Sequence, residues 1–422
     1  MATPLAALLC CLLASLLLLS SCKKDEPAQP IDLPQYGTTE GRVVVVYMAA
    51  ENSLGSYSST DLREMYSCAK YLGLNDHLIV YLDNTQLPRI YDFTYYSKDT
   101  PLDSIRPVRT YESDVNSCST EAMSDVLAYV RRNYPSQSYG LVLWSHGSGW
   151  IPPVPSPYTG ANNAWGAKLR SFGYDNGKNT LANTGGQLTI NDIRDVLQQF
   201  GTLDFLLFDA CFMQNIEVLY QLRHCARCIV GSPAEIPGPG APYQSLVKPM
   251  FQDSAYVEGM VQAYYDYYQA DNLYGVLLSA VDCAQLEHVA QVTQPYVKKY
   301  KQDLLYMDYT DVQDYFWWDS YFMNDYPDFY DMQGLMRAVL SAEEYPLWLA
   351  EYQKMFIAQV HTPTWYSAFN RSSNNKVDAQ QYSGVSMHIP LYKYAMRDKW
   401  FAPAYYDTDW AKAVWIETEE EE

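Results

Sequence analysis

Short apolar runs separated by amphipathic stretches make up the central part of the chain. Such runs, rich in β-branched or aliphatic residues, are typical of strands buried on both faces of a parallel sheet. They lie at 43–48, 77–82, 140–145, 203–208 and 227–231. The stretches between them place apolar residues at helical spacing. We expect helices at about 58–71, 119–134, 189–200 and 213–223, and a further strand at 274–281.

Two of these helices have clear start signals. Ser119 precedes a stretch with Glu121 in its first turn, and Thr189 has Asp192 three residues after it. Strands and helices alternate at lengths that fit right-handed crossovers. The pattern predicts an α/β fold with a mostly parallel central sheet and helices on both faces. Open sheets of this kind have their sites beyond the carboxyl ends of the strands.

Composition and charge restrict the class of protein. The chain has 422 residues, of which 48% are apolar and 18% charged, so it folds around a sizeable core as one large domain or as two or three units. The formal charge of −20 argues against nucleic acid as a partner and is compatible with cationic peptides. The 39 tyrosines predict half-buried surfaces or a wet exterior.

The N-terminal segment indicates the compartment. Residues 4–19 are almost wholly apolar, which is typical of a signal peptide, and Leu19-Ser20-Ser21-Cys22 resembles the lipobox of bacterial lipoproteins. We expect residues 1–21 to be removed and Cys22 to carry a lipid anchor, followed by a tether over 22–39. The protein would then be exported and anchored in the bacterial outer membrane or at the cell surface. The alternative is a plain signal peptide cut elsewhere.

The cysteines give no disulfide framework. After processing six remain, at irregular spacing: Cys68, Cys118, Cys211, Cys225, Cys228 and Cys283. The pair Cys225 and Cys228 has no second CxxC to complete a zinc site, so buried thiols or a local disulfide are expected. A thiol oxidoreductase using this pair lacks a thioredoxin-like context.

Cys211 and His146 are the candidates for nucleophilic chemistry. Each follows a predicted strand, and Cys211 also precedes a predicted helix, whose N-terminus would lower the pKa of the thiol. His146 is followed by Gly147 and Gly149, which let a substrate approach the backbone closely. Taken singly, each residue is better interpreted as a loop histidine or a buried thiol.

Together the two motifs resemble the clostripain family of caspase-like cysteine peptidases. The resemblance rests on the His-Gly motif in 141–150, the Asp-Ala-Cys motif in 209–213, and the segments 46–52, 188–193 and 384–390. It implies a caspase-like (caspase-hemoglobinase) fold for a peptidase domain at 40–392, with an aromatic, acidic insertion at about 300–335. Residues 393–422 would form a helical, aromatic-rich C-terminal extension with an acidic tail.

The resemblance also implies roles for individual residues. Cys211 would be the nucleophile that forms an acyl-enzyme, and His146 the general acid for the leaving amine. The backbone amides of Gly147 and Cys211 would bind the oxyanion. Asp209 would lie in the pocket for the residue before the cut and select Arg or Lys, although an acid here can also cap a helix. Segment 232–243 has fewer carboxylates than is usual in the family and no Trp, which implies altered subsites.

Relatives are often cut between the two motifs, where a loop of about 35 residues follows residue 150. Candidate sites of maturation there are Lys168, Arg170 and Lys178; the alternative is a loop that is never cut. No cofactor is expected. Some relatives are activated by calcium, and seven aspartates lie between Asp308 and Asp331, but their spacing matches no EF-hand and favours a solvated face. His388 is expected to be a packed histidine.

These observations predict a lipid-anchored cysteine endopeptidase that cleaves after Arg or Lys and acts on protein or peptide substrates. The competing hypothesis is an inactive surface lipoprotein of the same fold that binds peptides or glycans. The presence of both His146 and Cys211 disfavours it, because a binding protein has no chemical need for either.

Overall fold

A nine-stranded sheet forms the centre of the molecule in this computed structural model. The model describes residues 40–68, 72–94, 101, 104–152, 171–177, 183, 185–270, 274–317, 327–367, 374–391 and 401–416, which belong to one compact unit. In spatial order the strands are β13 (Phe356–His361), β10 (Leu277–Asp282), β9 (Ala226–Gly231), β8 (Leu203–Asp209), β5 (Ser138–Trp144), β1 (Arg42–Ala49), β2 (His77–Asp83), β3 (Arg89–Asp92) and β4 (Arg109–Thr110). The five strands from β9 to β2 run parallel, and the pairs at both edges are antiparallel. The expected mostly parallel sheet is confirmed.

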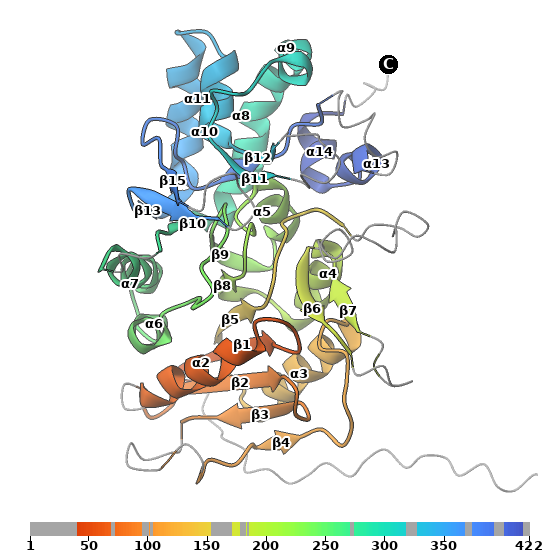
Figure 1. Cartoon of the computed structure of the whole chain (residues 1–422), viewed down its shortest axis with the longest axis vertical. Coiled ribbons are helices and arrows are strands. Elements are labelled where there is room, and N and C mark those ends of the chain that lie inside the picture. The colour runs from red at the N-terminus through yellow and green to blue at the C-terminus, as the bar shows by residue number, and fades with distance from the viewer. Residues whose placement is uncertain are drawn as a thin grey trace, which may run out of the picture. The chain divides into compact units, whose positions relative to one another are not determined.

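Helices cover both faces of this sheet. One row consists of α2 (Gly55–Ser67), α6 (Tyr243–Met250) and α7 (Tyr256–Ala270), and the other of α3 (Thr120–Asn133), α4 (Ile190–Phe200), α5 (Ile216–Leu222) and α8 (Leu286–Lys299). Figure 1 shows α6 and α7 on one side of the strands and α3 and α4 on the other. Alternate residues of β1, namely Val44, Val46 and Met48, lie in the same buried apolar cluster as residues of α2, α6 and α7. This alternation explains why the whole strand is apolar.

The helix starts at 119 and 189 follow the sequence signals, whereas two other helices differ from prediction. The Ser119 hydroxyl accepts a hydrogen bond from Ala122, and Thr189 and Asp192 form a capping box. α2 begins three residues earlier and ends four residues earlier than expected. α5 begins at residue 216, not 213, because the preceding residues hydrogen-bond to another loop: the N–H of Gln214 donates to the carbonyl of Ser232 at 3.0 Å.

Smaller elements lie between and beyond the main strands. The strands among them form the hairpin of β6 (Phe172–Asp175) and β7 (Gly186–Leu188), the sheet of β11 (Asp314–Trp317), β12 (Pro327–Asp331) and β16 (Ser386–Met387), and the pair β14 (Thr364–Tyr366) and β15 (Asn374–Lys376). The helices are α9 (Lys301–Tyr306), α10 (Met332–Val339), α11 (Glu344–Tyr352), α13 (Phe401–Tyr406) and α14 (Asp409–Val414). Two 3₁₀ turns are η3 (Cys283–Gln285) and η5 (Gln353–Met355). The long loop after residue 150 therefore contains strands β6 and β7, which the sequence reading missed.

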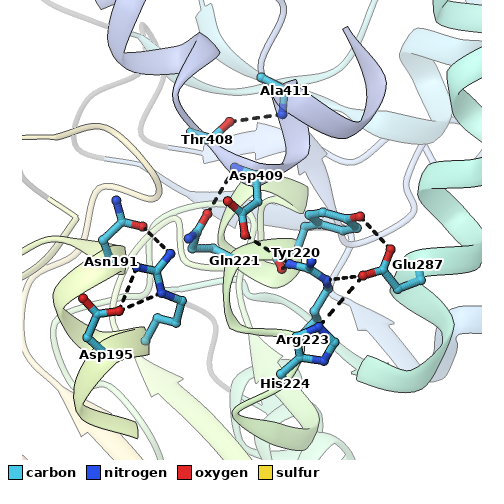
Figure 2. Close-up of polar contacts among 11 residues, drawn as sticks. Asn191, Asp195, Tyr220, Gln221, Arg223, His224, Glu287, Thr408, Asp409 and Ala411 are labelled. Atoms are coloured by element: carbon cyan, nitrogen blue, oxygen red, sulfur yellow. Dashed lines mark hydrogen bonds and ion pairs between the residues drawn. The ribbon is translucent and has the colours of Figure 1, made fainter. Parts of the chain in front are cut away.

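Charged and polar contacts hold the C-terminal helix α14 to α5 and α8, as Figure 2 shows. The guanidinium of Arg223, just after α5, contacts Glu287 of α8 at 2.6 Å and Asp409 of α14 at 3.3 Å. Tyr220 donates its hydroxyl proton to the same Glu287 at 2.7 Å. The Thr408 side chain caps α14.

The described aspartates of the acidic, aromatic segment before α10 differ in exposure: Asp308 and Asp311 are exposed, as expected for a solvated face, whereas Asp331 is not. Asp331 is fully buried and accepts hydrogen bonds from the Tyr315 hydroxyl at 2.7 Å and the Ser383 hydroxyl at 2.9 Å. The tyrosines contribute largely to the interior, where Tyr315 and Tyr352 are among the largest fully buried side chains. These two rings are more deeply buried than the expected half-buried surfaces, and their hydroxyls donate to Asp331 and Ser383.

Several expectations concern residues elsewhere. The six cysteines of the described chain are free thiols, and all except Cys211 are buried, so buried thiols are confirmed and a local disulfide is not formed. His388 is buried against the rings of Trp150 and Tyr405, as expected for a packed histidine. Cys22 and the tail 419–422 lie outside the described residues. Within the described ranges, no helix combines the length and the apolar character needed to cross a membrane.

Candidate active site

The loops after β5 and β8 converge at the carboxyl edge of the sheet. β5 and β8 are parallel neighbours in which Trp144 lies opposite Asp209, so each strand is followed two residues later by a candidate catalytic residue. The N–H of Ser145 donates to the carbonyl of Asp209 at 3.3 Å and continues the pairing. A Cβ added to Gly147 would lie 2.5 Å from the carbonyl oxygen of Cys211. The structure therefore brings the His-Gly loop directly against the backbone of the candidate nucleophile.

His146 is held from two sides. Its Nε2 lies 2.9 Å from the hydroxyl of Ser53, in the turn after β1. Its carbonyl accepts a hydrogen bond from the N–H of Gly173 in β6 at 2.8 Å. The preceding Ser145 donates its hydroxyl proton to Ala49 of β1 at 2.8 Å. These contacts fix the position of the imidazole and of the backbone that carries it.

Cys211 lies beside the loop after β9, and its thiol is buried although the residue as a whole is partly exposed. Its Sγ accepts a hydrogen bond from the N–H of Ile236 at 3.4 Å. Burial of the thiol, and secondly the charge of Glu235, raise its pKa to about 12. The expectation of a lowered pKa is wrong, because α5 begins only at Ile216 and the thiol does not lie at a helix end. At neutral pH the Cys211 thiol is therefore protonated.

The residue after Cys211 has a strained backbone. Phe212 has φ of 63°, in the left-handed region that a bulky residue rarely adopts. Its N–H donates to the carbonyl of Ala234 at 2.9 Å, its carbonyl accepts from the Asn215 side chain at 2.6 Å, and its ring stacks on Phe329. These contacts hold the turn that presents Cys211. No sequence signal identified this strain, since glycine is the usual residue at such angles.

Asp209 lies buried on the side of α6 and α7. Its carboxylate accepts hydrogen bonds from the N–H of Ala241 at 3.0 Å and from the hydroxyls of Tyr243 at 3.0 Å and Tyr264 at 3.2 Å. Burial raises the pKa of Asp209 to about 6, and the three donors oppose that rise. The helix-cap interpretation is wrong, because the side chain that caps α5 is that of Asn215.

A second buried acid lies near Asp209. Asp61 of α2 accepts a hydrogen bond from the indole of Trp144 at 2.8 Å. Burial, and next the charge of Asp209, raise the pKa of Asp61 to about 8. Both carboxyls therefore hold a proton more readily than an exposed aspartate does.

Sequence reasoning missed most of the residues that surround the two candidates. Ser53 lies one residue beyond the segment 46–52 that carried the family resemblance, and Tyr243 ends the segment 232–243 noted for its departures. Tyr264 of α7 gave no signal, because it belongs to a tyrosine-rich helix. The candidate maturation sites Lys168, Arg170 and Lys178 lie outside the described residues.

Comparisons with known proteins agree with this architecture. The peptidase C11 pattern, described as the clostripain family, matches residues 46–421. Clostripain of Hathewaya histolytica is 27% identical over 143 residues, which are 32% of this chain and 25% of that protein, so the match spans about a quarter of the relative's length.

Two solved structures cover nearly the whole chain. An inactive zymogen C11 protease from Parabacteroides distasonis has a TM-score of 0.72 and 29% identity, and covers 90% of this chain and 99% of its own. A secreted C11 cysteine protease from Bacteroides thetaiotaomicron, bound to an irreversible peptide inhibitor, has a TM-score of 0.71 and 28% identity, with 89% and 99% covered. The expected caspase-like α/β fold is confirmed.

Proposed function

Because the chain belongs to the clostripain family of cysteine peptidases, we propose that it hydrolyses peptide bonds on the carboxyl side of Arg or Lys, with Cys211 as nucleophile and His146 as general acid. The observation that carries this proposal is the contact between the two loops, in which Gly147 lies against the backbone of Cys211. A thiol and an imidazole delivered by adjacent parallel strands are the groups that acyl transfer needs.

The chemistry proceeds in two stages. The Cys211 sulfur attacks the substrate carbonyl carbon while its proton passes to the imidazole of His146, and the protonated imidazole then gives that proton to the leaving amine. Water next hydrolyses the thioester and restores the thiol. Neither the Gly147 nor the Cys211 N–H donates a backbone hydrogen bond within the described residues. Both amides are therefore available to bind the oxyanion.

Asp209 accounts for the basic specificity. Its carboxylate already accepts three hydrogen bonds, and a carboxylate offers about four lone-pair sites. One site is left for a guanidinium or ammonium group, which would pair with the charge in a poorly solvated pocket. Glu235, buried and close enough to Cys211 to raise its pKa, adds a second negative charge near the thiol. An acidic substrate residue would be repelled by both.

Fluorogenic peptides ending in Arg, Lys, Asp or Leu test the proposal. We expect turnover after Arg and Lys and its loss in Cys211→Ala and His146→Ala. Turnover should be retained in Cys225→Ala, a matched change of a buried cysteine that lies beside Leu203, at the opposite end of β8. Asp209→Asn should lose turnover after Arg. Equal turnover by Cys211→Ala and the parent would refute the peptidase, and peptide binding without turnover would favour an inactive binding protein.

Export, anchoring and maturation form the last part of the proposal. Relatives include a secreted protease, and the lipobox-like Leu19-Ser20-Ser21-Cys22 supports a lipid on Cys22. Detergent phase partitioning of the parent and Cys22→Ser tests the anchor, because only the parent should enter the detergent phase. Cleavage at Lys168, Arg170 or Lys178 would appear in the Arg- or Lys-ended fragments of the purified parent and be absent from Cys211→Ala.

A further inference from the structure

The start of the loop after β9 places a buried acid beside the Cys211 thiol. The N–H of Ile236 donates to the Sγ of Cys211 at 3.4 Å, and the residue before it, Glu235, is only 5% exposed. The Glu235 carboxylate accepts a hydrogen bond from the hydroxyl of Ser367, which directly follows β14. A segment more than 130 residues further along the chain is therefore joined to the loop at the thiol.

Three partly exposed tyrosines from distant segments come together near this acid. Tyr366 ends β14, and the ring of Tyr274 packs edge-on against it with 5.3 Å between the centroids. Tyr57 of α2 has its hydroxyl against the same loop, 2.7 Å from a Cβ added to Gly238. Burial, and next the charge of Glu235, raise the pKa of Tyr366, and the charges of Tyr274, Tyr57 and the thiol add to the rise. The Tyr366 hydroxyl thus lies within electrostatic reach of the acid, the thiol and both other tyrosines.

The acid and the tyrosines lie on one side of the thiol, and His146 lies on the other. Strand β8, which leads to Cys211, runs between β9, whose loop carries Glu235, and β5, whose loop carries His146 (Figure 1). The leaving amine has to lie within reach of the imidazole, so the substrate residues after the cut lie toward β5. The residues before the cut therefore lie toward β9 and β10. Since Asp209 is assigned to the residue directly before the cut, Glu235 and its tyrosines face the residue that precedes that one.

We propose that Glu235 and these three tyrosines form a subsite for a second basic side chain, that of the residue immediately before the cleaved Arg or Lys. A guanidinium or ammonium group is attracted by the faces of tyrosine rings and pairs with a carboxylate. An apolar side chain would remove water from Glu235 without supplying a positive charge, which is unfavourable. The preferred substrates are thus peptides and proteins with two consecutive basic residues. This inference rests on the proposed cleavage after Arg or Lys.

Peptides that differ only in this residue test the subsite. The full chain is assayed with acetyl-Ala-Xaa-Arg-aminomethylcoumarin, in which Xaa is Arg, Lys, Ala, Leu or Asp. We expect kcat/KM for Arg or Lys at Xaa to exceed that for Ala or Leu by about tenfold, and Asp to be the poorest. Glu235→Gln should lower the ratio of Arg to Ala at Xaa about tenfold, and Tyr366→Leu about threefold.

The ratio is the readout because Glu235 lies close to the thiol, and a change in the reactivity of the thiol affects both peptides equally. The matched control is Glu258→Gln, which changes an exposed acid of α7 and should keep the parental ratio. Melting temperatures verify that each variant is folded, and Tyr366→Leu provides a second test should Glu235→Gln fail to fold.

Three results would overturn the subsite. They are turnover of the Ala or Leu peptide by the parent that equals or exceeds that of the Arg peptide, an unchanged ratio in folded Glu235→Gln or Tyr366→Leu, and loss of the ratio in Glu258→Gln. Failure of the proposed function differs from these, because the parent would then hydrolyse none of the peptides. In that case calorimetry with Cys211→Ala decides: the Ala-Arg-Arg peptide should bind about tenfold more tightly than Ala-Ala-Arg, and equal affinities would contradict the subsite.

Discussion

Replacing Gly147 with Ala tests whether the contact between the two loops sets the catalytic geometry. The added Cβ would lie 2.5 Å from the carbonyl oxygen of Cys211 and 3.0 Å from the Sδ of Met213. The Met213 side chain can move, but the carbonyl belongs to the backbone of Cys211. Because Ala keeps the N–H proposed for the oxyanion, the substitution changes position without removing a donor.

The size of the effect follows from the required displacement. Carbon and oxygen seldom approach closer than about 3.2 Å, so one loop has to shift by roughly 0.7 Å. A misplacement of about 1 Å at reacting groups costs about 100-fold in rate. We therefore expect kcat/KM for an Arg peptide to fall between about 10-fold and 100-fold. Overpacking of this kind destabilises a protein by about 1 to 3 kcal/mol, which leaves the fold intact.

The assay compares Gly147→Ala with Gly259→Ala. In α7 the closest atom to an added Cβ at residue 259 is the Pro249 Cβ at 3.2 Å, a contact that small adjustments relieve. Both variants are assayed for turnover of the Arg peptide and for melting temperature, and the control should retain parental turnover. If Gly147→Ala has the turnover and the melting temperature of the parent, the contact between Gly147 and Cys211 does not set the catalytic geometry, because a shift of the two loops would then leave the rate unchanged.

Three further predictions address the surroundings of the site. Since burial raises the pKa of Asp209 to about 6, kcat/KM for Arg peptides should be about tenfold lower at pH 5 than at neutral pH, whereas kcat/KM for Leu peptides should not fall. Asp209→Asn should abolish this difference between Arg and Leu peptides. If the variant has the same pH profiles as the parent, Asp209 does not bind the Arg side chain. Glu217, fully buried, has its pKa raised to about 8 by burial, so its contribution to stability is present below about pH 4.5 and is lost as pH rises through 8. Glu217→Gln keeps an acceptor for the N–H of His388. Measured with denaturant, the gain in free energy of unfolding of the variant over the parent should be about 2 to 4 kcal/mol larger at pH 9 than at pH 5. A gain that does not change with pH would show that Glu217 carries no buried charge at high pH. Ser53→Ala should lower kcat/KM about three- to tenfold with little change in melting temperature, because it removes one hydrogen bond to the imidazole of His146. The control Ser67→Ala, at an exposed serine of α2, should have no effect. Equal activity of the two variants would show that Ser53 does not position His146.

The candidate site could be predicted only as far as local patterns reach. The ends of β5 and β8 were readable because each strand is a continuous apolar run, and the residues after parallel strands meet at one edge. The thiol pKa was predicted with the wrong sign, since the helix start at 216 depends on hydrogen bonds from residues 212–214 to the loop after β9. That loop lies about twenty residues further along the chain, and no pattern around Cys211 encodes it.

Sequence alone determined the alternation of strands and helices, the caps at Ser119 and Thr189, and the positions of the His-Gly and Asp-Ala-Cys motifs. Each of these depends on side chains within a few residues of one another, where periodicity and capping act. The tertiary structure decided the surroundings of Asp209, the strain at Phe212 and the grouping of Glu235 with three tyrosines. Those features arise because folding brings segments far apart in the chain into a poorly solvated interior, where the charge and hydrogen bonding of each group depend on its new neighbours.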